Sequence, residues 1–303
     1  MKLQTWYRKH RHYRYLLYAL PILVLWFVLA IYPHVQIIPL SMYKWGTFVQ
    51  SKEFVGGYYY KMLFTFQWKD TWKYICNTLW YIFFLFAIQT VMALSLALIL
   101  QKNTTHNKAF RALFFLPMVF SATMVSLTWS YMYDPNLGII NTILGNLGVE
   151  GYPGHNFFKP DWCAILFIVL VHIWHNIGYP ITIFTSGLQT IPSDIYEAAT
   201  LDGTNEWNRF WRVTFPLLLP TVLRTTMLTL STGALAYDYV LMMGSRMTTV
   251  SFDTWGSAIY KTISLDTDYG MASARSVILF VILVILCVAQ YIATKKVEDA
   301  YLG

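Results

Sequence analysis

Long hydrophobic stretches alternate with shorter polar stretches along the whole chain. A helix needs about 20 apolar residues to cross the ~30 Å hydrocarbon core of a bilayer, and about six segments reach that length. They lie near residues 15–40, 74–100, 109–133, 161–187, 216–242 and 271–293. Because the backbone has no water to bind in lipid, we expect each segment to be helical. The pattern predicts an all-α integral membrane protein with about six transmembrane helices.

The first and last of these segments differ in how regular they are. The last contains the run 277–293, which has no charged residue and is typical of a lipid-facing helix. The first contains Pro21, Pro33 and Pro39. Since proline removes a helix hydrogen bond, these residues predict kinks or an early helix end.

Composition leads to the same class of protein. Of the 303 residues, 56% are hydrophobic, 18% aromatic and only 12% charged, and the mean hydropathy is +0.45. A soluble domain carries about 25% charged residues, so this chain has too little polar surface to face water on all sides. The net charge of +7 comes from residues scattered between the apolar spans, which is typical of membrane topology signals rather than of a nucleic-acid site.

The cysteines add no chemistry to this picture. Cys76, Cys163 and Cys287 stand alone, without a CxxC motif or a metal-ligand cluster. We interpret them as small hydrophobic residues of the spans and expect no metal site.

Positive charge predicts the orientation in the membrane. The N-terminal segment, the loop after the second span and the C-terminal tail lie on one side if the spans number six, and each is basic. Their basic residues are Lys2, Arg8, Lys9, Arg11, Arg14, Lys102, Lys108, Arg111, Lys295 and Lys296. This side is predicted to be the cytoplasm. The opposite loop, 41–73, also holds lysines but is rich in aromatic residues, as is typical of a membrane surface.

These signals predict the organisation of the chain. No cleavable signal peptide is evident, because the first apolar run has no small-residue cleavage site. The expected parts are a cytoplasmic segment 1–14, a first span with an external loop 15–73, a core of five spans 74–293 and a cytoplasmic tail 294–303.

A partly polar loop at 188–215 separates the fourth and fifth spans on the predicted cytoplasmic side. Pro192 and Ser193 favour a helix start and Gly203 a helix stop, so we expect a helix over 194–202. Its spacing places four residues on one small, smooth face: Ile195, Ala198, Ala199 and Asp202. Helix signals alone are also compatible with an interfacial helix that only connects two spans.

The spacing of residues within this loop is a more specific signal than the helix start and stop. Glu197-Ala198-Ala199 is followed by three residues, Gly203, nine residues and the segment 213–216. This resembles the EAA loop of ABC importer permeases, with Val213 and Phe215 in place of the usual Ile and Leu. The resemblance implies a coupling helix that docks on a cytoplasmic ATPase subunit. The implied coupling residues are Glu197, Ala198, Ala199, Asp202 and Gly203.

Other segments extend the resemblance over nearly the whole chain. They are residues 31–45, 54–57, 77–79, 110–117, 127–144 and 269–274. Together they resemble the first permease of maltose- and glycerol-3-phosphate-type importers, which implies a type I ABC importer permease fold and a bacterial cytoplasmic membrane. The chain departs from this group after Tyr237-Asp238, where MMGSRM replaces a Gly-Gly-Pro run, and it lacks a glycine in the 101–108 loop. Sugar or oligosaccharide import is expected, and another small polar solute such as a glycerophosphodiester stays an alternative.

The resemblance also implies partners. They are a second permease, two ATPase subunits and an extracytoplasmic solute-binding protein. The chain has no GxxxxGK[ST] loop to bind ATP, and it lacks HExxH and GxSxG motifs. We therefore expect a non-catalytic subunit without its own cofactor, with ATP and Mg bound by the separate ATPase subunits.

Polar and aromatic groups within the spans are candidates for the substrate path, because burying them in lipid is costly. Aromatic faces and hydrogen-bonding side chains suit sugars. The candidates are Trp174, His175, Asn176, Tyr179, Tyr237, Asp238 and Tyr239. An interfacial aromatic belt and helix–helix contacts are the structural alternative, and Arg224 and Arg275 are expected to snorkel or pair.

A secondary transporter is the remaining competitor. It should show internal repeats or acidic residues in mid-span, but we find no repeat, and Asp238 is the sole candidate acid within a span.

Overall fold

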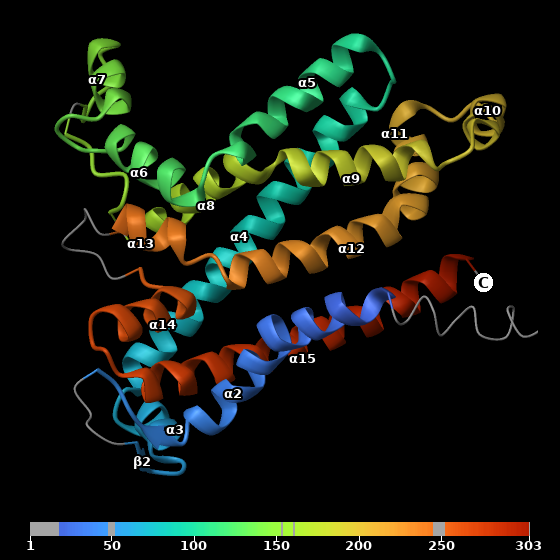
Figure 1. The fold of residues 1–303 in the computed structure, drawn as a ribbon. Helices are drawn as coiled ribbons and strands as arrows, with labels where there is room; N and C mark the ends of the chain where they lie inside the picture. The colour runs from blue at the N-terminus through green and yellow to red at the C-terminus, as the bar shows by residue number, and fades with distance from the viewer. Residues whose placement is uncertain (1–17, 48–51, 153, 160, 245–251, 303) are drawn as a thin grey trace, which may run out of the picture. The chain divides into compact units, whose positions relative to one another are not determined.

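Helices dominate the computed structural model of the chain, which describes residues 18–302 apart from 48–51, 153, 160 and 245–251 (Figure 1). The helices are η1 Phe27–Ile31, α2 Tyr32–Leu40, α3 Tyr58–Thr65, α4 Trp68–Leu100, α5 Thr105–Phe115, η2 Leu116–Val119, α6 Ala122–Met132, α7 Ile139–Asn146, α8 Asp161–Asn176, α9 Gly178–Gln189, α10 Ser193–Leu201, α11 Glu206–Arg209, η3 Phe210–Thr214, α12 Phe215–Ala234, α13 Asp238–Gly244, α14 Trp255–Ser264 and α15 Tyr269–Leu302. Two short strands, β1 Tyr43–Lys44 and β2 Glu53–Phe54, form an antiparallel pair. The basic N-terminal segment and the end of the MMGSRM run lie outside the described residues.

The predicted number of spans is confirmed. Among the described residues, four helices are long and apolar enough to cross a membrane: Tyr18–Leu40, Trp68–Leu100, Glu206–Ala234 and Tyr269–Lys296. Two bent helix pairs raise the number to as many as six. The first helix runs to Leu40, the end of the predicted span, so its prolines do not end it early. The wide π-helical turn η1 lies just before Pro33.

Two spans that the sequence predicts as continuous are in fact broken. The segment 109–133 is the pair Thr105–Val119 and Ala122–Met132, bent by 92°. The segment 161–187 is the pair Cys163–Asn176 and Gly178–Gln189, bent by 57°. The sequence does not reveal either bend, because the residues around a break are as apolar as those of a straight helix.

The prediction of a fifth span at 216–242 is wrong at both ends. The helix begins at Glu206, and the π-helical turn η3 lies just before Pro216, so the helix continues through this proline. It ends at Ala234, and α13 follows as a separate short helix. The apolar run therefore contains a helix, a break and part of a second helix.

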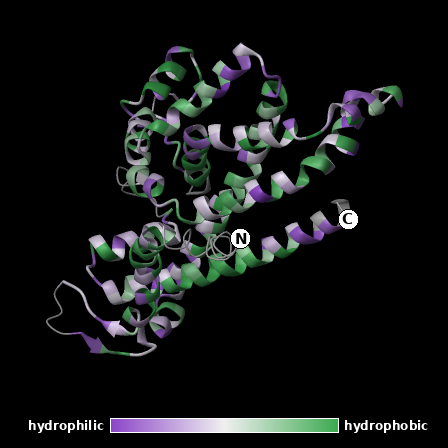
Figure 2. Cartoon of the chain, turned by 45° about the vertical axis from the view of Figure 1, so that its right-hand side comes forward, coloured by the Kyte–Doolittle hydropathy of each residue, from purple (hydrophilic) through white to green (hydrophobic). Residues whose placement is uncertain are grey.

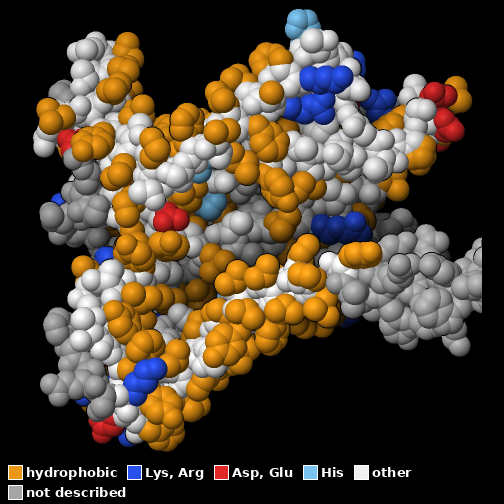
Figure 3. Space-filling view, viewed as in Figure 1, with side chains coloured by type: hydrophobic (Ala, Val, Ile, Leu, Met, Phe, Trp, Pro, Cys, Tyr) orange, Lys and Arg blue, Asp and Glu red, His pale blue; other side chains and the backbone are white. Residues whose placement is uncertain are grey.

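The surface of the spans is strongly apolar (Figure 3). Leu29 in the first span is 72% exposed, and Val91 and Ile99 on α4 are 65% and 71% exposed. The helix α15 is hydrophobic over most of its length and turns polar toward its C-terminal end (Figure 2). Such surfaces are unfavourable in water but suit hydrocarbon.

The chain divides into two compact units. One contains the residues up to Gln67 together with Lys261–Phe280, and the other contains Trp68–Tyr260 and the residues from Val281 onward. Contacts thus place residues 261–280 with the first span and its external loop, whereas the sequence places them in the 74–293 core.

In the larger unit, α4 lies at the centre and packs against α8, α9 and α12. Large side chains that are fully buried there include Tyr81, Leu85, Ile168, Phe184 and Leu218.

In the smaller unit, Asp268 joins segments that are distant in the sequence. Its carboxylate Oδ1 accepts a hydrogen bond of 2.9 Å from the Tyr59 hydroxyl and another of 2.9 Å from the amide of Met271, in the first turn of α15. Burial, with the nearby Asp268 carboxylate, raises the pKa of Tyr59, so this phenol stays protonated and donates at neutral pH.

Close backbone approach completes this unit. A Cβ added to Gly270 would lie 2.3 Å from the Tyr43 carbonyl oxygen, so only glycine fits there. Tyr43 is in turn paired with Phe54. Three of the segments that carry the family resemblance, 31–45, 54–57 and 269–274, therefore meet in one small structure. Arg275 pairs there as expected, donating to Thr262 and Gln67.

Candidate coupling loop and substrate path

The predicted helix in the 188–215 loop forms, shifted by one residue, as α10 over Ser193–Leu201. Pro192 precedes it in an extended conformation, and Asp194 lies in the first turn, where a negative charge favours the helix dipole. The sequence folds this way because proline and serine favour the start and the residues between them and Gly203 contain no helix breaker.

Gly203 ends this helix for a clear conformational reason. Its φ of +73° lies in the left-handed region, which only glycine adopts without strain. The Gly203 amide donates to the Thr200 carbonyl (3.0 Å), and the Thr204 amide donates to the Ala199 carbonyl (3.2 Å). The predicted stop is thus a hydrogen-bonded turn that reverses the chain toward α11.

The smooth face that we predicted on α10 is not presented as a whole. Ala199 is buried, whereas Glu197, Ala198 and Asp202 are exposed and Ile195 is 37% exposed. Ala199 packs toward the rest of the loop, because α10 contacts η3. Most of the predicted coupling residues therefore remain accessible to a partner.

The chain returns to the membrane as one continuous helix. The side chain of Asn205 caps its start, the helix α11, by accepting from the Asn208 amide at 2.8 Å. The helix then continues through η3 and α12 to Ala234. Aromatic rings pack along its start: Trp207, Phe210, Trp211 and Phe215 have ring centroids 5.0–5.9 Å from at least one other member of the group. The coupling loop is thus joined directly to a span by a continuous helix with a ring-packed start.

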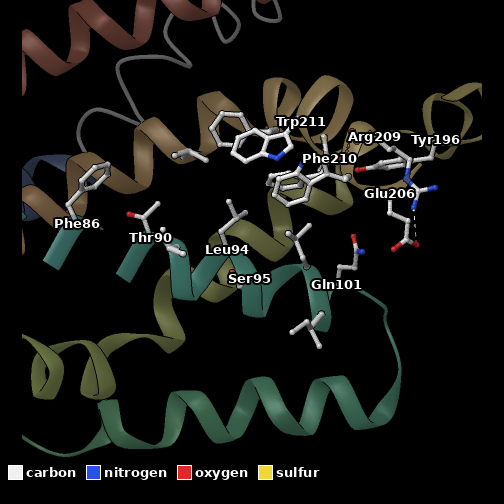
Figure 4. A pocket seen from close by; sticks show the side chains of 17 residues that line it. Phe86, Thr90, Leu94, Ser95, Gln101, Tyr196, Glu206, Arg209, Phe210 and Trp211 are labelled. Carbon is white, nitrogen blue, oxygen red and sulfur yellow. Dashed lines mark hydrogen bonds and ion pairs between the residues drawn. The ribbon is translucent and has the colours of Figure 1, made fainter. Parts of the chain in front are cut away.

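A cavity of about 1010 Å³ lies between α4 and this returning helix (Figure 4). Its walls are mostly apolar, with Leu94 and Phe86 from α4 and Trp211 and Phe210 from η3, and its polar end includes Tyr196 of α10. Glu206 and Arg209 form an ion pair of 3.6 Å at that end. The cavity reaches both the coupling loop and the end of α4, because Tyr196 and Gln101 both line it.

The coupling loop lies beside the basic loop that follows α4. The Gln189 side-chain amide donates to the Gln101 carbonyl at 3.1 Å. This places residues 188–215 and 101–111 at the same end of the larger unit, as the charge pattern predicts.

The seven candidates for the substrate path fall into two groups. Trp174, Tyr179 and Tyr237 are 46%, 45% and 37% exposed, and Asp238 is half-buried at the start of α13. These four reach the surface of the larger unit.

The other three form a hydrogen-bonded cluster. The Tyr239 hydroxyl lies 2.6 Å from His175 Nδ1 and 2.8 Å from Asn176 Nδ2. His175 and Tyr239 are buried, and Asn176 is half-buried. These side chains connect α8 with α13.

The structure adds residues that sequence reasoning missed. Trp129 packs edge-on against Trp174 with centroids 5.5 Å apart, and Tyr260 stacks on Tyr237 at 5.5 Å. His172 is buried, its ring stacks on Tyr239 at 4.5 Å, and its Nδ1 lies 2.8 Å from the Tyr81 hydroxyl. His172 could have been found as a polar residue one turn before His175, but no local signal marks Tyr81, Trp129 or Tyr260.

Known proteins resemble this chain along nearly its whole length. The multiple sugar-binding transport system permease protein MsmF of Streptococcus mutans is 30% identical over 276 residues, which cover 91% of this chain and 93% of MsmF. The trehalose/maltose transport system permease protein MalF of Thermococcus litoralis is 29% identical, with 88% of each chain covered.

The fold also has a solved counterpart. A chain in the crystal structure of a bacterial ABC transporter involved in the import of the acidic polysaccharide alginate matches with a TM-score of 0.78 and 21% identity, covering 98% of this chain and 99% of that one. The predicted ABC importer permease fold is therefore confirmed.

A family profile, described as binding-protein-dependent transport system inner membrane component, matches residues 89–299. This range includes the coupling loop, both bent spans and the two groups of path candidates. Since it spans well over half of the chain, the chain belongs to the family of binding-protein-dependent transport system inner membrane components.

Proposed function

We propose that this chain is the transmembrane permease subunit of an ATP-driven importer for a sugar or oligosaccharide. It forms the pathway with a second permease, receives its solute from an extracytoplasmic binding protein and is driven by two cytoplasmic ATPase subunits. The observation that carries this proposal is the coupling loop, in which an exposed helix ends at a glycine turn and leads into a continuous membrane-spanning helix.

Coupling uses the residues on α10. Glu197 is exposed and free to meet a basic group on an ATPase subunit, while Gly203 sets the turn that orients the helix. Movement of α10 reaches the span through the ring-packed start of the returning helix. A cavity of about 1010 Å³ beside α4 adjoins this start of the returning helix. Ligand-dependent alternation between two states follows from such a linkage.

The solute path uses the candidates that reach the surface. Trp174 with its neighbour Trp129, and Tyr237 with its neighbour Tyr260, offer ring faces for the apolar faces of a sugar. The half-buried Asp238 beside Tyr237 accepts hydrogen bonds from hydroxyl groups. The names of MsmF and MalF, both sugar permeases, support the same class of solute.

The chain itself supplies no ATP chemistry. ATP and Mg belong to the separate ATPase subunits, and the N-terminus lies in the cytoplasm of a bacterial cell with the coupling loop. The basic loop next to the coupling loop supports this orientation.

The test is purification of the tagged chain in mild detergent, with identification of the proteins that accompany it. We expect a second permease and an ATPase. In a Gly203→Pro variant the ATPase should be lost while the second permease is retained, since proline can neither adopt the positive φ nor donate to Thr200.

Gly148 provides a matched control. It has a φ of +74°, and its amide donates to the Gly145 carbonyl at 3.0 Å, but it follows α7, at the other end of the α5–α6 span from the coupling loop. Gly148→Pro should keep the ATPase bound. A wild-type chain that purifies folded and alone under all conditions would refute the importer-subunit proposal and favour a secondary transporter.

A further inference from the structure

The two broken spans of the larger unit touch each other at the bend between α8 and α9. Gly178, the first residue of α9, lies against the end of α5: an added Cβ would lie 2.6 Å from the Phe114 carbonyl oxygen and 2.9 Å from the Phe115 Cα. The helices α5 and α9 are in contact. The spans with bends of 92° and 57° are therefore packed against each other.

A break in a span leaves backbone groups without helical partners. Phe120, between η2 and α6, is extended with ψ of 155°, so its carbonyl is directed out of the helix. His175 Nε2 lies 3.1 Å from this carbonyl oxygen. An unsatisfied carbonyl inside a membrane is costly, so His175 supports the break.

The carbonyl determines the direction of the hydrogen bonds around it. A carbonyl only accepts, so His175 Nε2 carries the proton and Nδ1 is the acceptor. The Tyr239 hydroxyl therefore donates to His175 Nδ1 (2.6 Å) and accepts from Asn176 Nδ2 (2.8 Å). In this series of hydrogen bonds, every donor therefore faces an acceptor.

The network of side-chain contacts continues to α4. The His172 ring stacks on Tyr239 with centroids 4.5 Å apart, and His172 Nδ1 lies 2.8 Å from the Tyr81 hydroxyl. Tyr81, His172, His175 and Tyr239 are all buried. One network thus joins α4, α8 and α13 to the break before α6.

We propose that Tyr239, His175 and His172 are positioning residues for transport, which hold the two broken spans in their bent form and act without touching the solute. This proposal rests on the importer function given above. It gives His175 and Tyr239 a positioning role in place of the solute contact that the sequence predicts for them. The three side chains are buried and apart from the exposed candidates of the solute path, so losing their support of the break at Phe120 should slow the change of state rather than weaken solute binding.

The test compares variants of the complete importer complex in lipid nanodiscs. Tyr239→Phe keeps the ring that stacks on His172 but removes the hydroxyl. We expect backbone amide exchange in peptides covering 114–124 and 176–182 to rise at least about fivefold. With binding protein and maltose or trehalose as probe solutes, the maximal transport rate should fall at least about fivefold, with the half-saturation concentration unchanged within about twofold.

Two comparisons make this test selective. Tyr291→Phe, on an exposed tyrosine of α15, should match the wild type in both measurements. His175→Gln can still direct an amide N–H at the Phe120 carbonyl and should transport faster than His175→Leu, which has no donor. If Tyr239→Phe does not yield a folded complex, the His175 pair decides the question.

Three outcomes would overturn the proposal. A raised half-saturation concentration with unchanged exchange would mean that Tyr239 contacts the solute. Wild-type behaviour of Tyr239→Phe in both measurements would mean that the network is dispensable, and equal rates for the two His175 variants would remove the role of the carbonyl. If the wild type transports neither probe, the exchange measurement still tests the positioning role, so a failure of the sugar assignment is distinguished from a failure of this proposal.

Discussion

Single glycines show how closely this fold is specified at the scale of a residue. Gly203 is required by its backbone conformation, with φ of +73° and open space around it. Gly178 is required by the backbone of another helix, which leaves no room for a Cβ. The first requirement can be read from a helix-stop pattern, whereas the second depends on a contact with residues more than 60 positions away.

We expect Gly178→Ala to destabilise the protein by about 2 kcal/mol or more, because the Phe114 and Phe115 backbone must move to admit the methyl group. Thermal unfolding of the purified complex measures this change. Gly57→Ala is the control, since a Cβ there meets nothing within 4 Å and Gly57 has a negative φ. Equal melting temperatures for the two variants would contradict the tight contact.

Glu197→Gln should lower sugar-stimulated ATP hydrolysis by the assembled complex about fivefold or more while leaving its melting temperature unchanged. The reason is that this exposed carboxylate is assigned to the ATPase interface and not to the fold. Asp194→Asn, on the same helix and equally exposed, is the control. The same loss in both variants would indicate a general effect of charge on α10.

At the scale of elements, the ends of the helices determine the fold more than their interiors do. The sequence correctly predicts the existence of the spans and the short helix α10, because apolar length and capping residues are local properties. It does not predict the bends at Phe120 and Ile177 or the end of α12 at Ala234. The break at Phe120 has a partner from another helix, because His175 Nε2 lies 3.1 Å from the Phe120 carbonyl oxygen and His175 Nδ1 lies 2.6 Å from the Tyr239 hydroxyl.

The start of α15 offers a direct test of such a partner. Asp268→Ala removes the acceptor for both the Met271 amide and the Tyr59 hydroxyl, so we expect a local loss of about 2 kcal/mol. Hydrogen exchange should become faster in peptides covering 52–65 and 268–274. The exposed neighbour Asp266 is the control, and Asp266→Ala should leave both peptides unchanged; equal exchange in the two variants would argue against Asp268 as the link.

At the scale of the whole molecule, the membrane replaces water as the solvent of most of the surface. Exposed residues such as Leu29 and Ile99 are unfavourable in water and favourable in lipid. The coupling loop and the basic loop after α4 share one end of the larger unit, so the fold places together two loops that the charge pattern assigns to one side of the membrane.

This topology predicts which loops react with a membrane-impermeant thiol reagent. In a variant with Cys76, Cys163 and Cys287 replaced by serine, Asp194→Cys should react only in inside-out vesicles. Glu53→Cys, in the external loop, should react in intact cells. Labelling of both positions from the same side would contradict the predicted orientation.

The sequence by itself determined the class of protein, the number of spans, the position of the short helix α10 and its turn at Gly203. These features follow from solvent partition and local backbone preference, which act on neighbouring residues. Only the tertiary structure decided where the spans break, which candidates reach the surface and how His172 and Tyr81 join the site. The reason is that a buried carbonyl or a close backbone contact is satisfied by whichever residue the fold brings near, and apolar sequences around such a contact differ little from those around a straight helix.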